Sequence, residues 1–135
     1  MPKIRFARVF GNGAVLQRDR SIRIWGFTDS SSEITVKLAD NESKCTADEN
    51  GRFDACFPPL EAGGPYALSA SSPDGSFAKS TDIMVGDVIV ISGQSNMEFE
   101  LQNCTTGKEH LENDHPDVRF YYTQKKGDTD EDFLY

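Results

Sequence analysis

The feature that most constrains the fold is a run of four consecutive β-branched residues, Val88–Ile91, followed after Ser92 by the turn sequence Gly93-Gln94-Ser95-Asn96-Met97. Such a run is typical of a strand that is buried on both faces, as in parallel sheets. Gly93 allows the backbone to turn sharply, and the turn would lift Ser95 to the carboxyl edge of the sheet, where open α/β sheets place their chemistry. A serine between a strand and a helix has the arrangement of a nucleophile elbow, although most serines in such turns only cap a helix or complete the turn. Ser95 is therefore a candidate nucleophile.

The chain before this run has the pattern of an all-β domain. Apolar and polar residues alternate with period two from Glu33 to Leu38, and turn signals rich in Gly, Pro, Asn and Ser separate the short strands. This regular spacing predicts a small β-sandwich over residues 1–85. The other strands are expected at Ile4–Arg8, Ile22–Ile24, Phe53–Phe57 and Tyr66–Ala70. The expected core residues are Phe6, Val15, Leu16, Ile24, Trp25, Ile34, Val36, Leu38, Phe53, Phe57, Leu60, Tyr66 and Leu68.

The pattern changes in residues 86–135, which we expect to begin a second domain. The strand Val88–Ile91 is followed by a helical spacing of apolar residues from Asn96 to about Asn103, and then by a strand over Asp117–Tyr122. The order strand, helix, strand is the first unit of a parallel α/β domain. The predicted fold class is thus mainly β, a sandwich followed by an incomplete α/β domain.

The turn sequence Gly93–Met97 resembles the first conserved block of the SGNH hydrolases, in the variant found in sialate O-acetylesterases and some acetyl xylan esterases. The resemblance covers most of the chain, because further motifs precede this block in the order that sialate O-acetylesterases show. They are Val15–Arg18, Ile24–Gly26, Asp48 with Gly51, Gly63–Tyr66 and Gly86–Val88. The resemblance implies that residues 86–135 begin an SGNH hydrolase domain.

The resemblance also implies a carboxylic ester hydrolase that removes acetyl groups from sugars such as sialic acid. Ser95 would be the nucleophile and its backbone N–H an oxyanion donor, while Gln94 and Asn96 would line the substrate site or only hold the turn. The base in this family is the His of an Asp-x-x-His segment near the end of a longer chain. That segment is absent here, since neither His110 nor His115 follows an Asp by three residues. We therefore expect an incomplete amino-terminal part, which by itself lacks the catalytic base of the family.

Two other interpretations remain open. In the first, the sandwich is a non-catalytic module that binds carbohydrate or protein. In the second, a separate chain supplies the missing catalytic residues. The sequence does not distinguish them, nor does it identify the sugar.

Charge and composition restrict the partners. The 14 basic and 22 acidic residues give a net charge of −8, which disfavours nucleic acid and anionic membranes. No metal or other cofactor is expected, because His110 and His115 have the wrong spacing for a helical zinc pair. We interpret both histidines as solvated surface residues, and the acidic residues Asp128–Asp132 as a solvated tail. The first residues lack the apolar core of a signal peptide, so the chain is expected to be soluble. The compartment stays open, since the resembling esterases are often secreted, periplasmic or lysosomal.

The cysteines leave a disulfide open. If Asn50-Gly51 is a two-residue hairpin turn, Cys45 and Cys56 lie directly opposite each other, within reach of a disulfide. Two buried free thiols are an equal alternative.

Overall fold

The computed structural model describes residues 3–29, 31–92 and 116–122. The chain divides into two compact units, Met1–Asp87 with Tyr121–Tyr135, and Val88–Phe120. In the described residues, eight strands and one 3-10 turn all precede Asp87. They are β1 (Ile4–Phe6), η1 (Arg8–Phe10), β2 (Val15–Gln17), β3 (Ile22–Thr28), β4 (Glu33–Leu38), β5 (Asn41–Thr46), β6 (Arg52–Phe57), β7 (Gly63–Ser71) and β8 (Phe77–Gly86).

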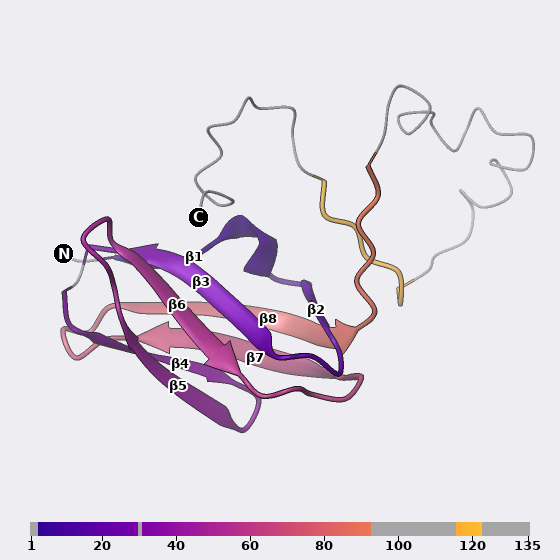
Figure 1. Ribbon diagram of the computed structural model, residues 1–135, viewed down its shortest axis with the longest axis horizontal. Helices are drawn as coiled ribbons and strands as arrows, with labels where there is room; N and C mark the ends of the chain where they lie inside the picture. Colours follow the sequence, from indigo (N-terminus) through magenta and orange to yellow (C-terminus); the bar gives the residue numbers. More distant parts are fainter. Residues whose placement is uncertain (1–2, 30, 93–115, 123–135) are drawn as a thin grey trace, which may run out of the picture. The chain divides into compact units, whose positions relative to one another are not determined.

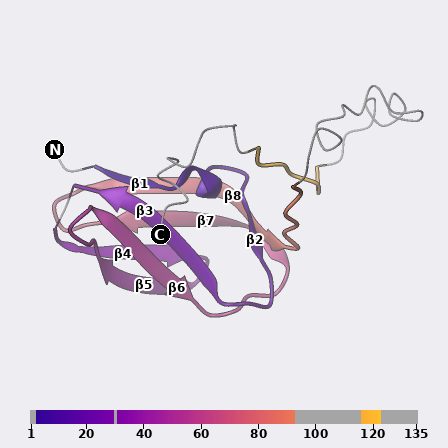
Figure 2. The ribbon, with the colours of Figure 1, turned by 45° about the horizontal axis from the view of Figure 1, so that its top comes forward.

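The strands form two stacked sheets (Figure 1). The smaller sheet has the order β1-β3-β6, and all its pairs are antiparallel. The larger sheet has the order β2-β8-β7-β4-β5 and is antiparallel except at its edge, where β2 pairs with β8 in parallel. The tilted view in Figure 2 shows the same two layers. The predicted β-sandwich is therefore confirmed.

Strict alternation explains the core between the sheets. In β4, the inward residues Ile34, Val36 and Leu38 are fully buried, while the outward residues are polar. β3 buries every second residue in the same way, from Ile22 to Thr28. Eight of the expected core residues are buried, and Phe6, Trp25, Leu60 and Tyr66 pack against the core while partly exposed. The core also contains small or isolated residues that the pattern missed, including Ala7, Phe10, Ala55 and Val85.

The longest strand, β8, was not predicted, because its alternation changes phase in the middle. Ala78 and Ser80 point inward in its first half, but Ile83 and Val85 do so in its second half. The change follows Thr81 and Asp82, both exposed, and Asp82 has a positive φ of 57°. An irregularity of this kind shifts the side-chain register by one residue. The period-two pattern of β8 is therefore divided into two short fragments, neither of which predicts the whole strand.

The predicted hairpin between Cys45 and Cys56 is wrong. β5 and β6 follow one another in the chain but belong to different sheets, so Cys45 pairs with Ile34 and Cys56 pairs with Arg23. Both thiols are free. The connection crosses between the layers because β6 pairs with β3 in the smaller sheet, where its residues Phe53 and Ala55 are buried.

The predicted strands after Gly86 are also not formed in the described residues. Residues 87–92 and 118–122 adopt no regular secondary structure, and Ile89 and Val90 are 80% and 87% exposed. A short apolar run becomes a buried strand only where neighbouring strands and covering layers enclose it. The predicted helix over Asn96–Asn103 lies outside the described residues. In the part of the chain described here, no helix is long and apolar enough to span a membrane.

Candidate functional site

The predicted site residues Ser95, Gln94 and Asn96 lie outside the described residues. His110 and His115 also lie outside them. The structure describes the segment of the sandwich that leads to Ser95, and a hollow elsewhere on its surface.

The end of β8, from which the chain continues toward Ser95, is held by the loop and strand that precede Asp19. Leu16 pairs with Val85 and Gln17 with Gly86 in the parallel register of β2 and β8. Directly after this pair, the Arg18 N–H donates to the Gly86 carbonyl oxygen at 2.9 Å. The end of the sandwich is therefore fixed by backbone hydrogen bonds from a segment about seventy residues earlier in the chain.

An ion pair extends this connection by one residue. Arg18 Nε donates to Asp87 Oδ1 at 3.0 Å, and this hydrogen bond raises the pKa of Arg18. Both side chains are exposed, so the pair orients the chain at Asp87 more than it stabilises the fold. Two of the motifs that carry the family resemblance, Val15–Arg18 and Gly86–Val88, are thus brought together. Both motifs were noted in the sequence, but their contact was not predicted. They lie at opposite ends of the domain, and no local pattern indicates such a contact.

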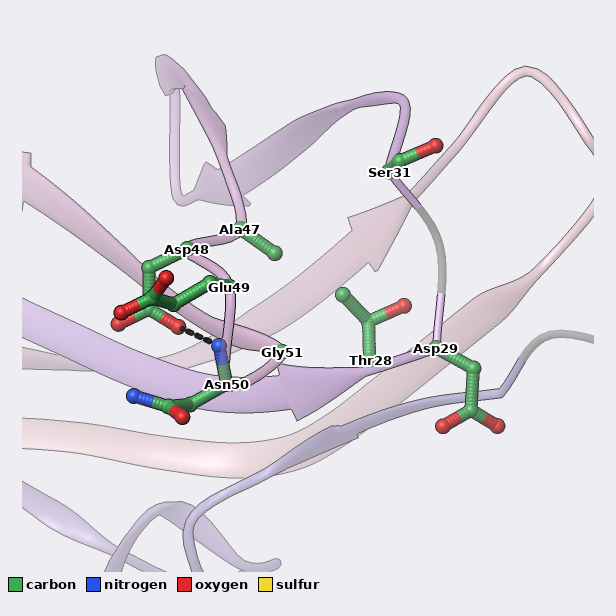
Figure 3. A pocket seen from close by; sticks show the side chains of 8 residues that line it. All are labelled: Thr28, Asp29, Ser31, Ala47, Asp48, Glu49, Asn50 and Gly51. Atoms are coloured by element: carbon green, nitrogen blue, oxygen red, sulfur yellow. Dashed lines mark hydrogen bonds between the residues drawn. The ribbon is translucent and has the colours of Figure 1, made fainter.

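The hollow lies between the end of β3 and the loop that joins β5 to β6 (Figure 3). It is open to solvent and has a volume of about 450 Å³. Its lining residues are Thr28, Asp29, Ser31, Ala47, Asp48, Glu49, Asn50 and Gly51.

Hydrogen bonds within the loop give this hollow a structural explanation. Asp48 Oδ1 accepts hydrogen bonds from the backbone N–H groups of Asn50 and Arg52, at 2.8 and 3.0 Å. Gly51 has a φ of +79°, and its carbonyl oxygen accepts a hydrogen bond from the Thr28 N–H at 2.7 Å. A Cβ at Gly51 would lie 2.5 Å from the Thr28 carbonyl oxygen. Asp48 therefore holds the turn together and Gly51 bonds the turn to β3; both residues belong to the motifs quoted for the resemblance.

Within the described ranges, the hollow shows no arrangement of catalytic or metal-binding side chains. Among the residues that the structure describes there is no histidine, and no group of three or more His, Cys, Asp or Glu side chains is placed to hold a metal ion. A hydroxyl nucleophile needs a neighbouring base, and Ser31 has no histidine near it in this part of the chain.

Comparison with known proteins identifies the class of protein to which this fold is similar. No protein-family model matches the chain. The structure is similar to that of a carbohydrate acetylesterase from Xanthomonas citri, with a TM-score of 0.75 and 31% sequence identity. That match covers 80% of this chain and 25% of the bacterial chain.

The curated relatives are more specific than the structural match, because they are sialate O-acetylesterases. The chain is 29% identical to the sialate O-acetylesterase of Mus musculus and 31% identical to that of Rattus norvegicus, over 79% and 78% of its length. It spans only about a fifth of these relatives, 22% and 21% of their lengths. The predicted resemblance to the sialate O-acetylesterase family is confirmed.

Proposed function

We propose that the chain is the amino-terminal part of a carbohydrate O-acetylesterase, with Ser95 as its nucleophile. The observation that carries this proposal is the extent of the similarity. The matches to acetylesterases cover 79% and 80% of this 135-residue chain, and the chain also contains the block Gly93–Met97 that resembles the family. The organisation proposed is a sandwich over residues 1–85 and the start of an SGNH hydrolase domain over 86–135.

The proposed reaction is acyl transfer to water. The Ser95 Oγ attacks the acetyl carbonyl carbon while a histidine base removes its proton, and the sugar hydroxyl leaves with that proton. Water then hydrolyses the acetyl-serine to release acetate and the free serine. The Ser95 backbone N–H stabilises the negative oxygen of the tetrahedral intermediate, and a donor of this kind is worth about 3–4 kcal/mol in the transition state.

The remaining roles depend on the same resemblance. Gln94 and Asn96 line the substrate site beside the nucleophile, and an O-acetylated sugar is the substrate. The histidine and its aspartate come from a later segment of the same polypeptide or from a second chain. The reaction as proposed needs no metal and no other cofactor.

The contact between Arg18 and Asp87 supports a positioning role for the sandwich. It holds Asp87, which directly follows β8 and precedes the segment that carries Ser95. The sandwich then serves as the base on which the catalytic segment begins.

Two measurements test this function. The reading frame downstream of Tyr135 is sequenced, and the polypeptide that it encodes is assayed for acetate release from O-acetylated sialic acid. An in-frame Asp-x-x-His segment and an activity that Ser95→Ala abolishes are expected. Full activity in the Ser95→Ala enzyme would contradict the proposal.

The 135-residue chain gives a second, independent result. Because a serine without a base is a weak nucleophile, its turnover of p-nitrophenyl acetate should equal that of its Ser95→Ala variant. A rate well above background that disappears in Ser95→Ala would show that this chain supplies its own base, with His115 the first candidate.

A further inference from the structure

The sandwich contains two Asn-Gly dipeptides, Asn12-Gly13 and Asn50-Gly51. This dipeptide is chemically reactive, because the backbone nitrogen of the glycine can attack the amide carbon of the preceding asparagine side chain. Glycine has no Cβ to shield that nitrogen, and the chain already holds the two reacting groups close together. Each dipeptide is therefore a candidate for spontaneous deamidation.

The backbone is similar at the two dipeptides. Both asparagines are exposed and lie in turns. Gly13 and Gly51 have φ values of 83° and 79°. Each glycine N–H also donates to a backbone carbonyl oxygen at 3.0 Å. Neither exposure nor backbone conformation therefore distinguishes the two sites.

The asparagine side chains differ in their hydrogen bonds. Asn12 Oδ1 accepts hydrogen bonds from the Thr81 N–H at 2.8 Å and from the Thr81 hydroxyl at 3.5 Å. Within the described residues, the side-chain amide of Asn50 has no hydrogen-bond partner, and only its backbone N–H is bonded. Figure 3 shows this side chain extending away from Thr28 and Asp29. Asn50 can thus rotate onto the following nitrogen freely, whereas Asn12 must first separate from Thr81.

We propose that Asn50 is a site of spontaneous deamidation and that the fold protects Asn12. The Gly51 nitrogen loses its proton and forms a bond to Asn50 Cγ, and the side-chain nitrogen leaves as ammonia, which gives a succinimide ring. Water then opens the ring at one of its two carbonyl carbons, to give aspartate or isoaspartate. The net change replaces an amide by a carboxylate, with one water consumed and one ammonium released.

The product alters the bonds that join this turn to β3. Isoaspartate adds one carbon atom to the main chain directly before Gly51, whose carbonyl oxygen accepts the Thr28 N–H at 2.7 Å. The new carboxylate also joins those of Asp48 and Glu49 in the same turn, and like charges repel. Amide hydrogen exchange at Thr28 should therefore become severalfold faster in the modified chain.

Tryptic peptides separate the two sites, because Asn12 lies in the peptide Val9–Arg18 and Asn50 in Cys45–Arg52. The full chain is incubated at mildly alkaline pH, in buffer and in concentrated urea, and the modified fraction of each peptide is measured by mass spectrometry. In buffer, Asn50 should react about tenfold faster than Asn12, the factor that the hydrogen bonds to Thr81 supply. In urea the two rates should become similar, because those hydrogen bonds are lost.

Two variants give a matched control. Asn50→Gln should remove most of the labelling of the incubated chain by an isoaspartyl methyltransferase, because glutamine closes the corresponding larger ring far more slowly. Asn12→Gln should leave that labelling in place. Equal or faster reaction at Asn12 in buffer would overturn the proposal. A preference for Asn50 that persists in urea would also overturn it, because the sequence rather than the fold would then set the rates.

Discussion

The sandwich and the described residues after Gly86 contain similar apolar side chains, but these side chains are buried in the sandwich and exposed after Gly86. In the sandwich, Ile24, Ile34 and Phe53 are completely buried. After Gly86, Ile89, Val90 and Phe120 are 80%, 87% and 86% exposed. The two regions therefore differ in the packing of their apolar residues rather than in the presence of such residues.

The comparison shows what alternation contributes. A strand with one apolar face completes a core with a single opposing layer, as β4 does beneath the smaller sheet. A strand that is apolar on both faces requires a layer on each side. The sandwich supplies the first arrangement from its own residues, so we propose that it is the part of this chain that folds by itself.

The largest expected effect comes from truncating one phenylalanine in each region. Phe53→Ala should lower the free energy of unfolding by about 3–5 kcal/mol, because its ring is fully buried between the sheets. Phe120→Ala should change it by less than about 0.5 kcal/mol. Urea denaturation followed by circular dichroism measures both values. Equal losses would show that the segment after Gly86 shares the core.

Two glycines with positive φ in the sandwich distinguish the free-energy cost of backbone strain from that of a steric clash. Gly51→Ala should cost about 2–4 kcal/mol, because the new Cβ meets the Thr28 carbonyl oxygen as well as adopting an unfavourable φ. At Gly75 the φ is +91° and nothing lies within 4 Å of an added Cβ. Gly75→Ala should therefore lower the free energy of unfolding by about 1–2 kcal/mol. Urea midpoints compare the two variants, and the reverse order would contradict this account of the loop.

The boundary between the regions is tested by Asp87→Asn. The variant loses the ion pair with Arg18 but keeps the core, so its urea midpoint should stay close to that of the unmodified chain. Amide hydrogen exchange at Arg18 should become severalfold faster, because its N–H bond to Gly86 loses a neighbouring restraint. Glu42→Gln, which removes an exposed pair with Lys37 elsewhere, is the control. Unchanged exchange at Arg18 would show that the backbone alone fixes the end of β8.

The smallest effect concerns the thiols. Burial raises the pKa of Cys45, while a hydrogen bond from the Asp54 backbone opposes the shift. The unfolded chain therefore loses this proton at a lower pH than the native protein, and the free energy of unfolding falls as pH rises above the ordinary thiol pKa of about 8.5. Cys45→Ala should reduce this alkaline loss in urea midpoints measured between neutral and alkaline pH. Cys56→Ala, at an exposed position, is the control, and the same reduction in both would contradict the assignment.

Much of the fold was predictable, and the exceptions have physical causes. β4 has perfect alternation and was found with its correct bounds. β8 was missed because the irregularity near Asp82 reverses its inward face. The turn around Gly51 was found, but a turn sequence does not specify whether the next strand joins the same sheet or the opposite one. That choice depends on where Phe53 is buried, which is a long-range property.

The candidate site follows a similar division. Ser95 was proposed from a local sequence of five residues, and it stays a prediction because it lies outside the described residues. The Arg18–Asp87 pair is described but was not predicted, since it joins residues 69 positions apart. Local motifs point to chemistry, whereas the contacts that position them arise only in the folded chain.

Hydrogen exchange across the whole chain tests the central claim most directly, namely that the sandwich ending at Gly86 is the autonomously folded part. Core strands such as β3, β4 and β7 should retain their amide protons longest, while Ile89, Val90 and Ile91 should exchange within the dead time or become protected only on self-association. Slow exchange at Ile89–Ile91 and at Val118–Phe120 in a monomeric sample would contradict the claim. It would show that the segment after Gly86 is packed as firmly as the sandwich.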